Sequence, residues 1–346
     1  MRPLVARLGL VTAGSVVALV LAEIVVRLFG LAPQVAFIHR GQFRLSDNDR
    51  IGWEPIPDPG SAGATEERGW NPSERNGLGF RDRDHALDKP PGVYRILVLG
   101  DSITKGLGVP DKERIFPAVL ERKLDESGLT SEVINFGVEG YNTQQEVETL
   151  EEKGLVYKPD LVVLAYSLND RDWPAHHLYR EMLEQEFHRG WISDARISPF
   201  LAPSALYRFL RYRVLARFPR GSSAIEETIR KRIDLVQQDT VEEYFGVLAD
   251  LARSNRFDVL VAVFPYLDDL VHYRHNDQHE WVRVLSSRHG FHHLDLLDPL
   301  TRCQEFYHHE VAADDVHPNI LGHNCAGITM ADFIEKRIVP GAKKNP

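Results

Sequence analysis

The stretch Arg-Ile-Leu-Val-Leu-Gly-Asp-Ser-Ile-Thr-Lys-Gly, residues 95–106, decides the fold of this chain. Its apolar run, 96–99, is typical of a short strand that is covered on both faces of a parallel sheet. The chain leaves this strand at a glycine, and Ser102 falls in the turn that follows, at the edge where open α/β sheets bind ligands. Two interpretations stay open. Asp101 or Ser102 caps a helix, or Ser102 is a nucleophile held at the mouth of the sheet.

Strands and helices alternate on both sides of this turn. We expect strands over 95–99, 132–136, 160–166, 258–264 and 292–296, and helices over 116–126, 143–153, 241–254 and 319–337. This alternation predicts an α/β fold with a parallel five-stranded sheet and helices on both faces. A further edge strand is expected near 77–81.

The N-terminal segment, residues 1–32, differs from everything after it. Two arginines precede an apolar run, and a helix over 8–31 is long enough to span the core of a bilayer. The charges inside it, Glu23 and Arg27, lie four apart on one helical face and can pair. We therefore expect one transmembrane helix that acts as a signal anchor, and a cleaved signal peptide is the alternative.

Composition divides the rest of the chain into a stalk and lead-in over 33–92 and a main domain over 93–340. Arginines lie on both sides of the apolar run, but the short N-terminal tail favours a main domain outside the cytoplasm, at the inner membrane. Residues 173–235 break the alternation and are expected to form an insertion. A long insertion at the C-terminal edge of the strands favours a lid over the site. The insertion contains a basic, aromatic stretch over 206–218, and contact with the membrane surface or a plain solvated helix stay open as alternatives.

Charge and cysteine content limit the partners and the compartment. The formal net charge of -9 argues against a nucleic-acid partner, because no broad basic face is available to meet phosphates. The two cysteines, Cys303 and Cys325, can form one disulfide in an oxidising compartment. A free buried pair is equally compatible with the sequence.

A second group of reactive side chains stands near the C-terminus, in Ala-Asp-Asp-Val-His-Pro-Asn-Ile-Leu-Gly-His, residues 313–323. Asp314 and His317 lie three apart in an expected turn before a helix, so one can orient the other. A serine hydrolase needs such a pair, with a general base that takes the hydroxyl proton and a carboxylate that fixes the imidazole tautomer. The alternative is that Asp314 or Asp315 only caps a turn while His317 packs on the following helix.

Two loops follow the second and third expected strands and lie at the same edge of the sheet. The first, Asn-Phe-Gly-Val-Glu-Gly-Tyr-Asn at 135–142, has glycines that bring backbone N–H groups close to a ligand. The second, 167–170, offers the side-chain amide of Asn169. An acyl-transfer enzyme must stabilise a developing oxyanion with fixed donors. The backbone N–H groups of Ser102 and Gly140, together with this amide, can supply three.

These blocks resemble the SGNH or GDSL hydrolases, whose four motifs match residues 100–103, 135–140, 167–170 and 314–317. The resemblance places the family's nucleophile on Ser102, its oxyanion donors on Ser102, Gly140 and Asn169, and its base and acid on His317 and Asp314. One departure is a serine, Ser167, where the third motif usually begins with glycine.

The resemblance spans about 94–335 and implies a three-layer α/β/α flavodoxin-like fold that hydrolyses an ester or thioester without a cofactor or metal. An Asn-Gly-Leu-Gly-Phe-Arg stretch, 76–81, and the leading apolar helix are also similar to membrane-anchored bacterial members. By that analogy the substrate is an acyl ester, with an acetylated glycan or a lipid as the two candidates.

Several functions fit these residues. We expect a serine esterase that removes O-acetyl or other short acyl groups at the cell envelope. An O-acyltransferase with the same triad is the main alternative, since water access to the acyl-enzyme decides between them. A lipid esterase or thioesterase, and a non-catalytic anchored scaffold, are also open. A phosphate loop lacks the required residue order, and the His308, His309, Glu310 and Asp314 group lacks a metal-binding spacing.

Overall fold

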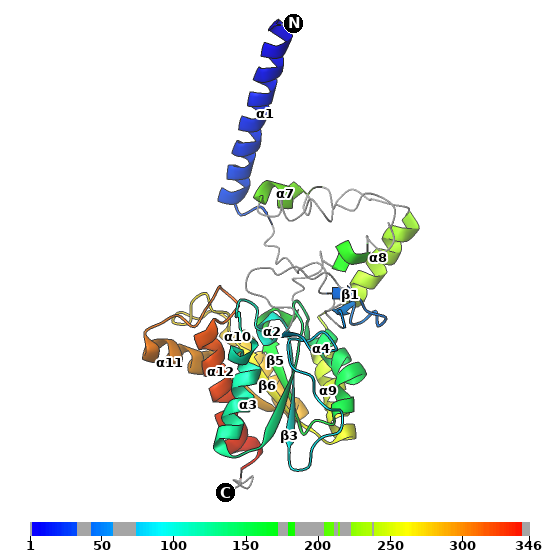
Figure 1. The fold of residues 1–346 in the computed structure, drawn as a ribbon, viewed down its shortest axis with the longest axis vertical. Helices are drawn as coiled ribbons and strands as arrows, with labels where there is room; N and C mark the ends of the chain where they lie inside the picture. The colour runs from blue at the N-terminus through cyan, green and yellow to red at the C-terminus, as the bar shows by residue number, and fades with distance from the viewer. Residues whose placement is uncertain are drawn as a thin grey trace. The chain divides into compact units, whose positions relative to one another are not determined.

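The computed structural model of the chain describes residues 2–32, 43–57, 74–171, 179–183, 204–210, 214, 223–236 and 239–340. The chain forms two compact units. One comprises Met1–Phe37 and His177–Lys231, and the other comprises Ile38–His176 and Arg232–Pro346. The larger unit holds the central sheet and the residues expected to form the site (Figure 1).

The sheet of the larger unit has five strands in the order β4-β3-β5-β6-β7, and every neighbouring pair is parallel. The strands are β3 (Tyr94–Gly100), β4 (Ser131–Gly137), β5 (Leu161–Ser167), β6 (Asp258–Phe264) and β7 (His292–Asp295). Since β3 and β4 are the first and second strands of this sheet along the chain, the order is the flavodoxin-like 2-1-3-4-5. The expected parallel five-stranded sheet is confirmed.

Helices cover both faces of this sheet. One layer consists of α3 (Phe116–Ser127), α11 (Leu297–Tyr307) and α12 (Ile320–Phe333). The other consists of α4 (Thr143–Thr149), α9 (Val241–Asn255) and α10 (Asn276–His289). Figure 1 shows α3 and α12 on one side of the strands and α4 and α9 on the other. The helices α10 and α11 were not among those expected, and α4 passes into a π-helical turn at Leu150–Gly154.

The apolar patterns of the strands account for the core. The middle of β3, Ile96–Leu99, has no exposed surface, and β5 is buried along its whole length. Burial on both faces explains why these strands read as continuous apolar runs rather than alternating ones. The helix α3 begins with Pro117 in its first turn, where proline is favoured, and ends at Gly128, whose φ of +96° suits glycine.

The lead-in belongs to the same compact unit as the sheet. Its strands β1 (Phe43–Leu45) and β2 (Trp53–Pro55) form an antiparallel pair, and the fully buried Trp53 accepts a hydrogen bond on its carbonyl from the Tyr141 hydroxyl. The prediction of an edge strand near 77–81 is wrong. This segment is a turn, because the Asn76 side-chain oxygen accepts hydrogen bonds from two backbone N–H groups further along it.

The smaller unit contains the expected N-terminal helix, α1 (Arg2–Leu28), and the predicted Glu23–Arg27 ion pair is present at 2.7 Å. In the part of the chain that the structure describes, no helix has the length and apolar character needed to cross a membrane. The Glu23 carboxylate also accepts hydrogen bonds at the start of α7 (Ala205–Phe209). Most of the insertion expected to form a lid, 173–235, lies outside the described residues, and so does most of its stretch 206–218.

The two cysteines form a disulfide, Cys303–Cys325, which joins α11 to α12. The sequence left a disulfide and a free buried pair of thiols open, and the structure shows the disulfide. The bridge connects the helices on either side of the loop that carries Asp314 and His317.

Candidate active site

The turn after β3 combines both interpretations of the opening stretch. Asp101 caps the short helix α2 (Ser102–Lys105), since its Oδ1 atom accepts a hydrogen bond from the backbone N–H of Ile103 at 2.8 Å. Ser102 is the first residue of that helix and is 6% exposed. The cap and the expected nucleophile are thus neighbouring residues with separate roles, and the acid fixes the turn that presents the serine.

The structure brings Ser102, His317 and Asp314 into one hydrogen-bonded chain. The Ser102 Oγ atom lies 2.9 Å from His317 Nε2, and His317 Nδ1 lies 2.8 Å from Asp314 Oδ2. With the imidazole neutral, Nδ1–H donates to the carboxylate and Nε2 accepts the serine O–H, which is the tautomer that a general base needs. Ser102 and His317 are 215 positions apart in the sequence, so their contact depends on the fold.

The Asp314 carboxylate has an environment that favours its charged form. Burial acts to raise its pKa, but hydrogen bonds from the backbone N–H groups of His317 and Val316 and from the His317 ring outweigh burial and lower the pKa. Its side chain is 59% exposed, so water also solvates the charge. The carboxylate is therefore ionised at neutral pH and can stabilise an imidazolium on His317.

The loop that carries this pair is held at both ends. An isolated bridge joins Ala312 to Pro318, and the Asn319 side chain donates to the Ala312 carbonyl at 3.1 Å. The same Asn319 side chain caps α12 by accepting hydrogen bonds from two backbone N–H groups. From the loop after β6, the backbone N–H of Leu267 donates to the Asp315 carbonyl at 2.7 Å. These contacts fix His317 before any substrate arrives.

The strand register brings the expected oxyanion donors to the same edge of the sheet. Gly100 at the end of β3 pairs with Gly137 of β4 and Ala165 of β5, and the chain reaches Gly140 and Asn169 within four residues of these partners. Gly140 has a φ of +78°, a conformation that favours glycine. Among the residues that the structure describes, neither the Ser102 N–H nor the Gly140 N–H has a hydrogen-bond acceptor.

Asn169 follows β5 in the short 3-10 helix Leu168–Arg171. Asn169 acts to lower the pKa of the Asp101 carboxyl, so its side chain lies beside the residue that caps α2. Its amide nitrogen has two N–H donors that can serve an oxyanion. The departure from the usual motif, Ser167, is the last residue of β5 and pairs regularly with Phe264, so this position does not need the conformational freedom of glycine.

Three buried carboxyl groups lie beneath the turn, and the sequence did not single them out as a group. Asp101, Glu146 and Asp170 are nearly or fully buried, and burial, together with the neighbouring acids for the latter two, raises the pKa of each. The Thr143 hydroxyl donates to Asp170 at 2.6 Å, whereas neither oxygen of Glu146 has a hydrogen-bond partner. One sequence signal was present, because Glu146 lies four residues before the buried Leu150 on one helical face.

Metal chemistry finds no support in this region. In the described ranges, no group of three or more His, Cys, Asp and Glu side chains is arranged to hold a metal ion. The chemistry available at this edge of the sheet is that of a hydroxyl, an imidazole, a carboxylate and fixed N–H donors.

Similarity to solved structures is low in sequence. An acetyl xylan esterase, AlAXEase, aligns with 69% of this chain and 99% of its own at 16% identity and a TM-score of 0.43. A member of the lipolytic protein G-D-S-L family from Veillonella parvula DSM 2008 covers 71% and 98% at 17% identity and a TM-score of 0.38. A two-domain esterase active on acetylated mannans covers 73% and 51% at 14% identity and a TM-score of 0.41.

No curated protein sequence matches the chain. The sequence profile of the GDSL-like Lipase/Acylhydrolase family matches residues 98–325, which is more than half of the chain and includes every residue of the site described above. The chain therefore belongs to the GDSL-like lipase/acylhydrolase family, within the SGNH/GDSL superfamily, and is an ester-hydrolysing serine hydrolase.

Proposed function

We propose that this enzyme is an esterase that uses Ser102 as its nucleophile, His317 as general base and acid, and Asp314 to orient and stabilise the imidazole. The observation that carries the proposal is the continuous hydrogen-bonded chain from Ser102 Oγ through both ring nitrogens of His317 to Asp314. This is the arrangement that activates a hydroxyl at neutral pH.

The reaction has two halves. Ser102 Oγ forms a bond to the acyl carbonyl carbon while its proton passes to His317 Nε2, and the imidazolium then protonates the alcohol that leaves. A water molecule next gives a proton to His317 and attacks the acyl-serine, which releases the carboxylic acid and restores Ser102. In both halves the carbonyl oxygen becomes negative, and the N–H groups of Ser102 and Gly140 and the Asn169 amide are proposed to hold it.

The substrate in this proposal is an O-acetyl or other short acyl ester. Two observations support a compact acyl group: the nucleophile is only 6% exposed, and the residue at the end of β5, Ser167, is small and buried. Each CH₂ of a longer chain that finds an apolar pocket is worth about 0.8 kcal/mol. A long-chain esterase would therefore show kcat/KM rising steadily with acyl length, and the short-chain enzyme proposed here would not.

The role of Ser102 is tested by Ser102→Ala on a p-nitrophenyl ester series from acetate upward, beside acetate release from acetylated glycans. We expect a loss of kcat of at least about a thousandfold. Ser127→Ala is the matched control, because its hydroxyl makes one bond at the end of α3, to the Leu124 carbonyl. Wild-type turnover by the Ser102→Ala enzyme would refute the proposed nucleophile, and a steady rise with chain length without acetate release would refute the short-chain substrate.

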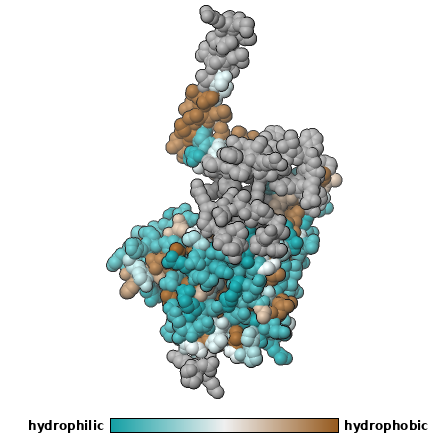
Figure 2. Space-filling model, in the orientation of Figure 1, coloured by the Kyte–Doolittle hydropathy of each residue, from teal (hydrophilic) through white to brown (hydrophobic). Residues whose placement is uncertain are grey.

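We also propose that the enzyme works at the cell envelope, attached to the inner membrane by its N-terminal helix and facing away from the cytoplasm. Support comes from the exposed apolar side chains along the described part of α1 (Figure 2), which include Val16, Val17, Leu19, Val20, Leu21, Ile24 and Leu28. Such a surface is costly in water and favourable in lipid. Reporters active only outside or only inside the cytoplasm, fused to the C-terminus, test the orientation, and recovery of the chain in the soluble fraction would refute the attachment.

A further inference from the structure

A buried arginine of the lead-in holds the turn that presents Ser102. Arg81 belongs to the stretch 76–81, which the proposed reaction does not use, yet its side chain is only 2% exposed. Its Nη1 atom donates to the Gly106 carbonyl at 2.8 Å and to the Lys105 carbonyl at 3.3 Å, and its Nη2 atom donates to the Val109 carbonyl at 2.7 Å. Its Nε atom donates to Glu74 at 2.8 Å. One guanidinium therefore closes the C-terminal end of the nucleophile turn.

These carbonyls need a partner from outside the helix. The helix α2 has only four residues, too few to be stable alone. Its internal hydrogen bonds use the carbonyls of residues 101–103, which accept from the N–H groups of residues 105, 107 and 106. The carbonyls that follow have no later helical turn to satisfy them, and buried carbonyls without donors are costly. The Asn135 side chain donates to the Thr104 carbonyl, and the Val109 N–H donates to the Gly106 carbonyl at 3.2 Å. Arg81 supplies the donor to the Lys105 carbonyl and further donors to the Gly106 and Val109 carbonyls.

The same contacts reach the loop of the proposed oxyanion donor. The Asn135 side chain in β4 donates to the carbonyls of both Arg81 and Thr104, at 3.2 and 3.1 Å. The Lys105 ammonium forms a buried ion pair with Glu139, at 3.1 Å, and Glu139 directly precedes Gly140. The lead-in, the nucleophile turn and the second motif are thus joined by one network.

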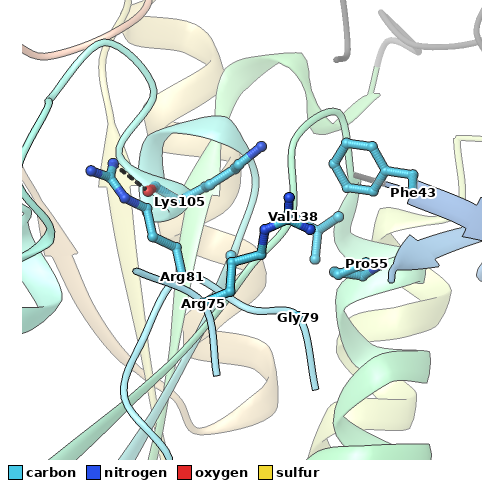
Figure 3. Close-up of a pocket in the computed structure, with 8 residues that line it drawn as sticks. Phe43, Pro55, Arg75, Gly79, Arg81, Lys105 and Val138 are labelled. Carbon is cyan, nitrogen blue, oxygen red and sulfur yellow. Dashed lines mark hydrogen bonds between the residues drawn. The ribbon is translucent and has the colours of Figure 1, made fainter. Parts of the chain in front are cut away.

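The turn around Arg81 is built to place it there. Gly79 has a φ of +89°, and a Cβ atom at this position would lie 2.5 Å from the Ile56 carbonyl oxygen. Phe80 packs against Phe136 of β4 with ring centroids 4.6 Å apart. The backbone conformation and the aromatic anchor together direct the next side chain at the end of α2, as Figure 3 shows for Arg81 and Lys105.

We propose that Arg81 is a positioning residue for Ser102 and for the donor loop at Gly140, and this inference rests on the proposed function. The planar guanidinium reaches three carbonyls and a carboxylate at once, which a lysine ammonium on a flexible stem does not reproduce. Displacement of a reacting group by about 1 Å costs on the order of a hundredfold in rate. The effect is expected in kcat, because Arg81 holds the reacting serine and is not placed to bind substrate.

The test compares Arg81→Ala and Arg81→Lys with Arg83→Ala, a matched control whose side chain is half exposed and paired with Glu121. With p-nitrophenyl acetate we expect kcat to fall about ten- to a hundredfold in Arg81→Ala and less in Arg81→Lys, with KM within about threefold of wild type. Arg83→Ala keeps wild-type kcat. Methylguanidinium restores part of the activity of Arg81→Ala only, because this substitution vacates the position of the guanidinium beside a small hollow that Arg81 lines.

Unchanged kcat in both Arg81 variants overturns the inference, and so does a loss that methylguanidinium does not reverse. Hydrogen exchange separates positioning from general destabilisation and does not depend on turnover. The amides of Lys105, Gly106, Leu107 and Val109 should exchange faster in the Arg81 variants and not in Arg83→Ala, while β5 keeps its protection. Faster exchange throughout the sheet overturns the inference.

Labelling by a fluorophosphonate distinguishes failure of the Arg81 inference from failure of the proposed function. Wild-type enzyme that is not labelled at Ser102 refutes the proposed nucleophile. The local exchange pattern alone then decides whether Arg81 holds the turn. Labelling of wild type at Ser102 together with slower labelling of Arg81→Ala supports both proposals.

Discussion

Carboxyl groups lie on two sides of the nucleophile turn, and their environments are opposite. On the outer side, Asp314 is 59% exposed and accepts hydrogen bonds from two backbone N–H groups and the His317 ring, so its pKa is lowered. On the inner side, Asp101, Glu146 and Asp170 are buried, and the pKa of each is raised. The same functional group is charged at the rim of the site, while beneath the turn burial shifts each carboxyl toward its neutral form.

The opposite pKa shifts on the two sides suit the charges that the proposed reaction would create near each position. Asp314 lies beyond His317, where a negative charge favours the imidazolium that the proposed mechanism forms in the transition state. Asp101 and Asp170 directly precede and follow two of the proposed oxyanion donors, Ser102 and Asn169, where a second negative charge would oppose the one that develops on the substrate. Burial raises the pKa of both carboxyls and so disfavours that second charge.

The largest effect is expected from Asp314→Asn, which removes the charge but keeps the shape of the side chain. The amide cannot stabilise an imidazolium and favours the wrong tautomer of His317, so kcat should fall by about a thousand- to ten-thousandfold. Steady-state kinetics with p-nitrophenyl acetate measure the loss, and circular dichroism confirms the fold. A loss of less than about tenfold would show that Asp314 does not orient the base.

The next effect is expected at Asn169, the proposed oxyanion donor that lies beside the inner carboxyl Asp101. Asn169→Ala should lower kcat by about a hundred- to a thousandfold, with little change in KM, because the lost donor acts on charge that develops only in the transition state. A comparable rise in KM with unchanged kcat would instead assign this side chain to substrate binding.

The sequence predicted the candidate catalytic residues at the rim of the site better than the buried residues beneath the nucleophile turn, its floor. Ser102, Asp314, His317 and Asn169 stand in short local motifs at the ends of strands or helices, and local patterns carry that information. The strands themselves were predicted within two residues at each end, because burial on both faces gives continuous apolar runs.

The floor depends on contacts between distant segments. Apart from the spacing of four between Glu146 and Leu150, nothing local distinguishes Glu146 from Glu148, two residues later. Among the described residues the buried Glu146 carboxyl has no hydrogen-bond partner, whereas Glu148 is paired with Arg50 and Tyr244. Arg81 was read as part of an edge strand because the Asn76 turn that redirects the chain looks like an ordinary polar segment. The helix α10 has a weak helical period, whereas α11 was missed although its amphipathic pattern is as clear as that of α9.

The contrast between Asp314 and the buried carboxyls is tested more sharply when the same change, Asp to Asn, is made at the buried Asp170. Asp170→Asn should keep kcat at pH 7 within about threefold of wild type, since burial and the neighbouring acid raise the pKa of Asp170 well above its usual value and favour the neutral form that the amide mimics. The new amide oxygen can still accept the Thr143 hydroxyl. A loss as large as that of Asp314→Asn would contradict the assignment of a neutral carboxyl to this position.

The smallest expected effect is on stability. Glu146→Met removes a buried carboxyl that has no hydrogen-bond partner and replaces it with an apolar chain of similar length. Because the folded-state pKa of Glu146 is raised above the unfolded value, folding holds a proton that the unfolded chain releases. That contribution is complete below about pH 4.3, the unfolded pKa, and is lost as the pH rises toward the folded pKa.

Wild type should therefore lose stability relative to Glu146→Met as the pH rises from about 4.5 to 8, and the variant should be more stable at pH 8 by on the order of 1 kcal/mol. Urea unfolding at several pH values measures the difference. Glu148→Met is the matched control on the same helix, and it should lower stability at every pH near neutrality because Arg50, Asn48 and Tyr244 lose their acceptor. A gain at Glu146 that does not grow with pH would mean that the carboxyl is not held neutral, and the contrast between the two sides of the turn would then rest on exposure alone.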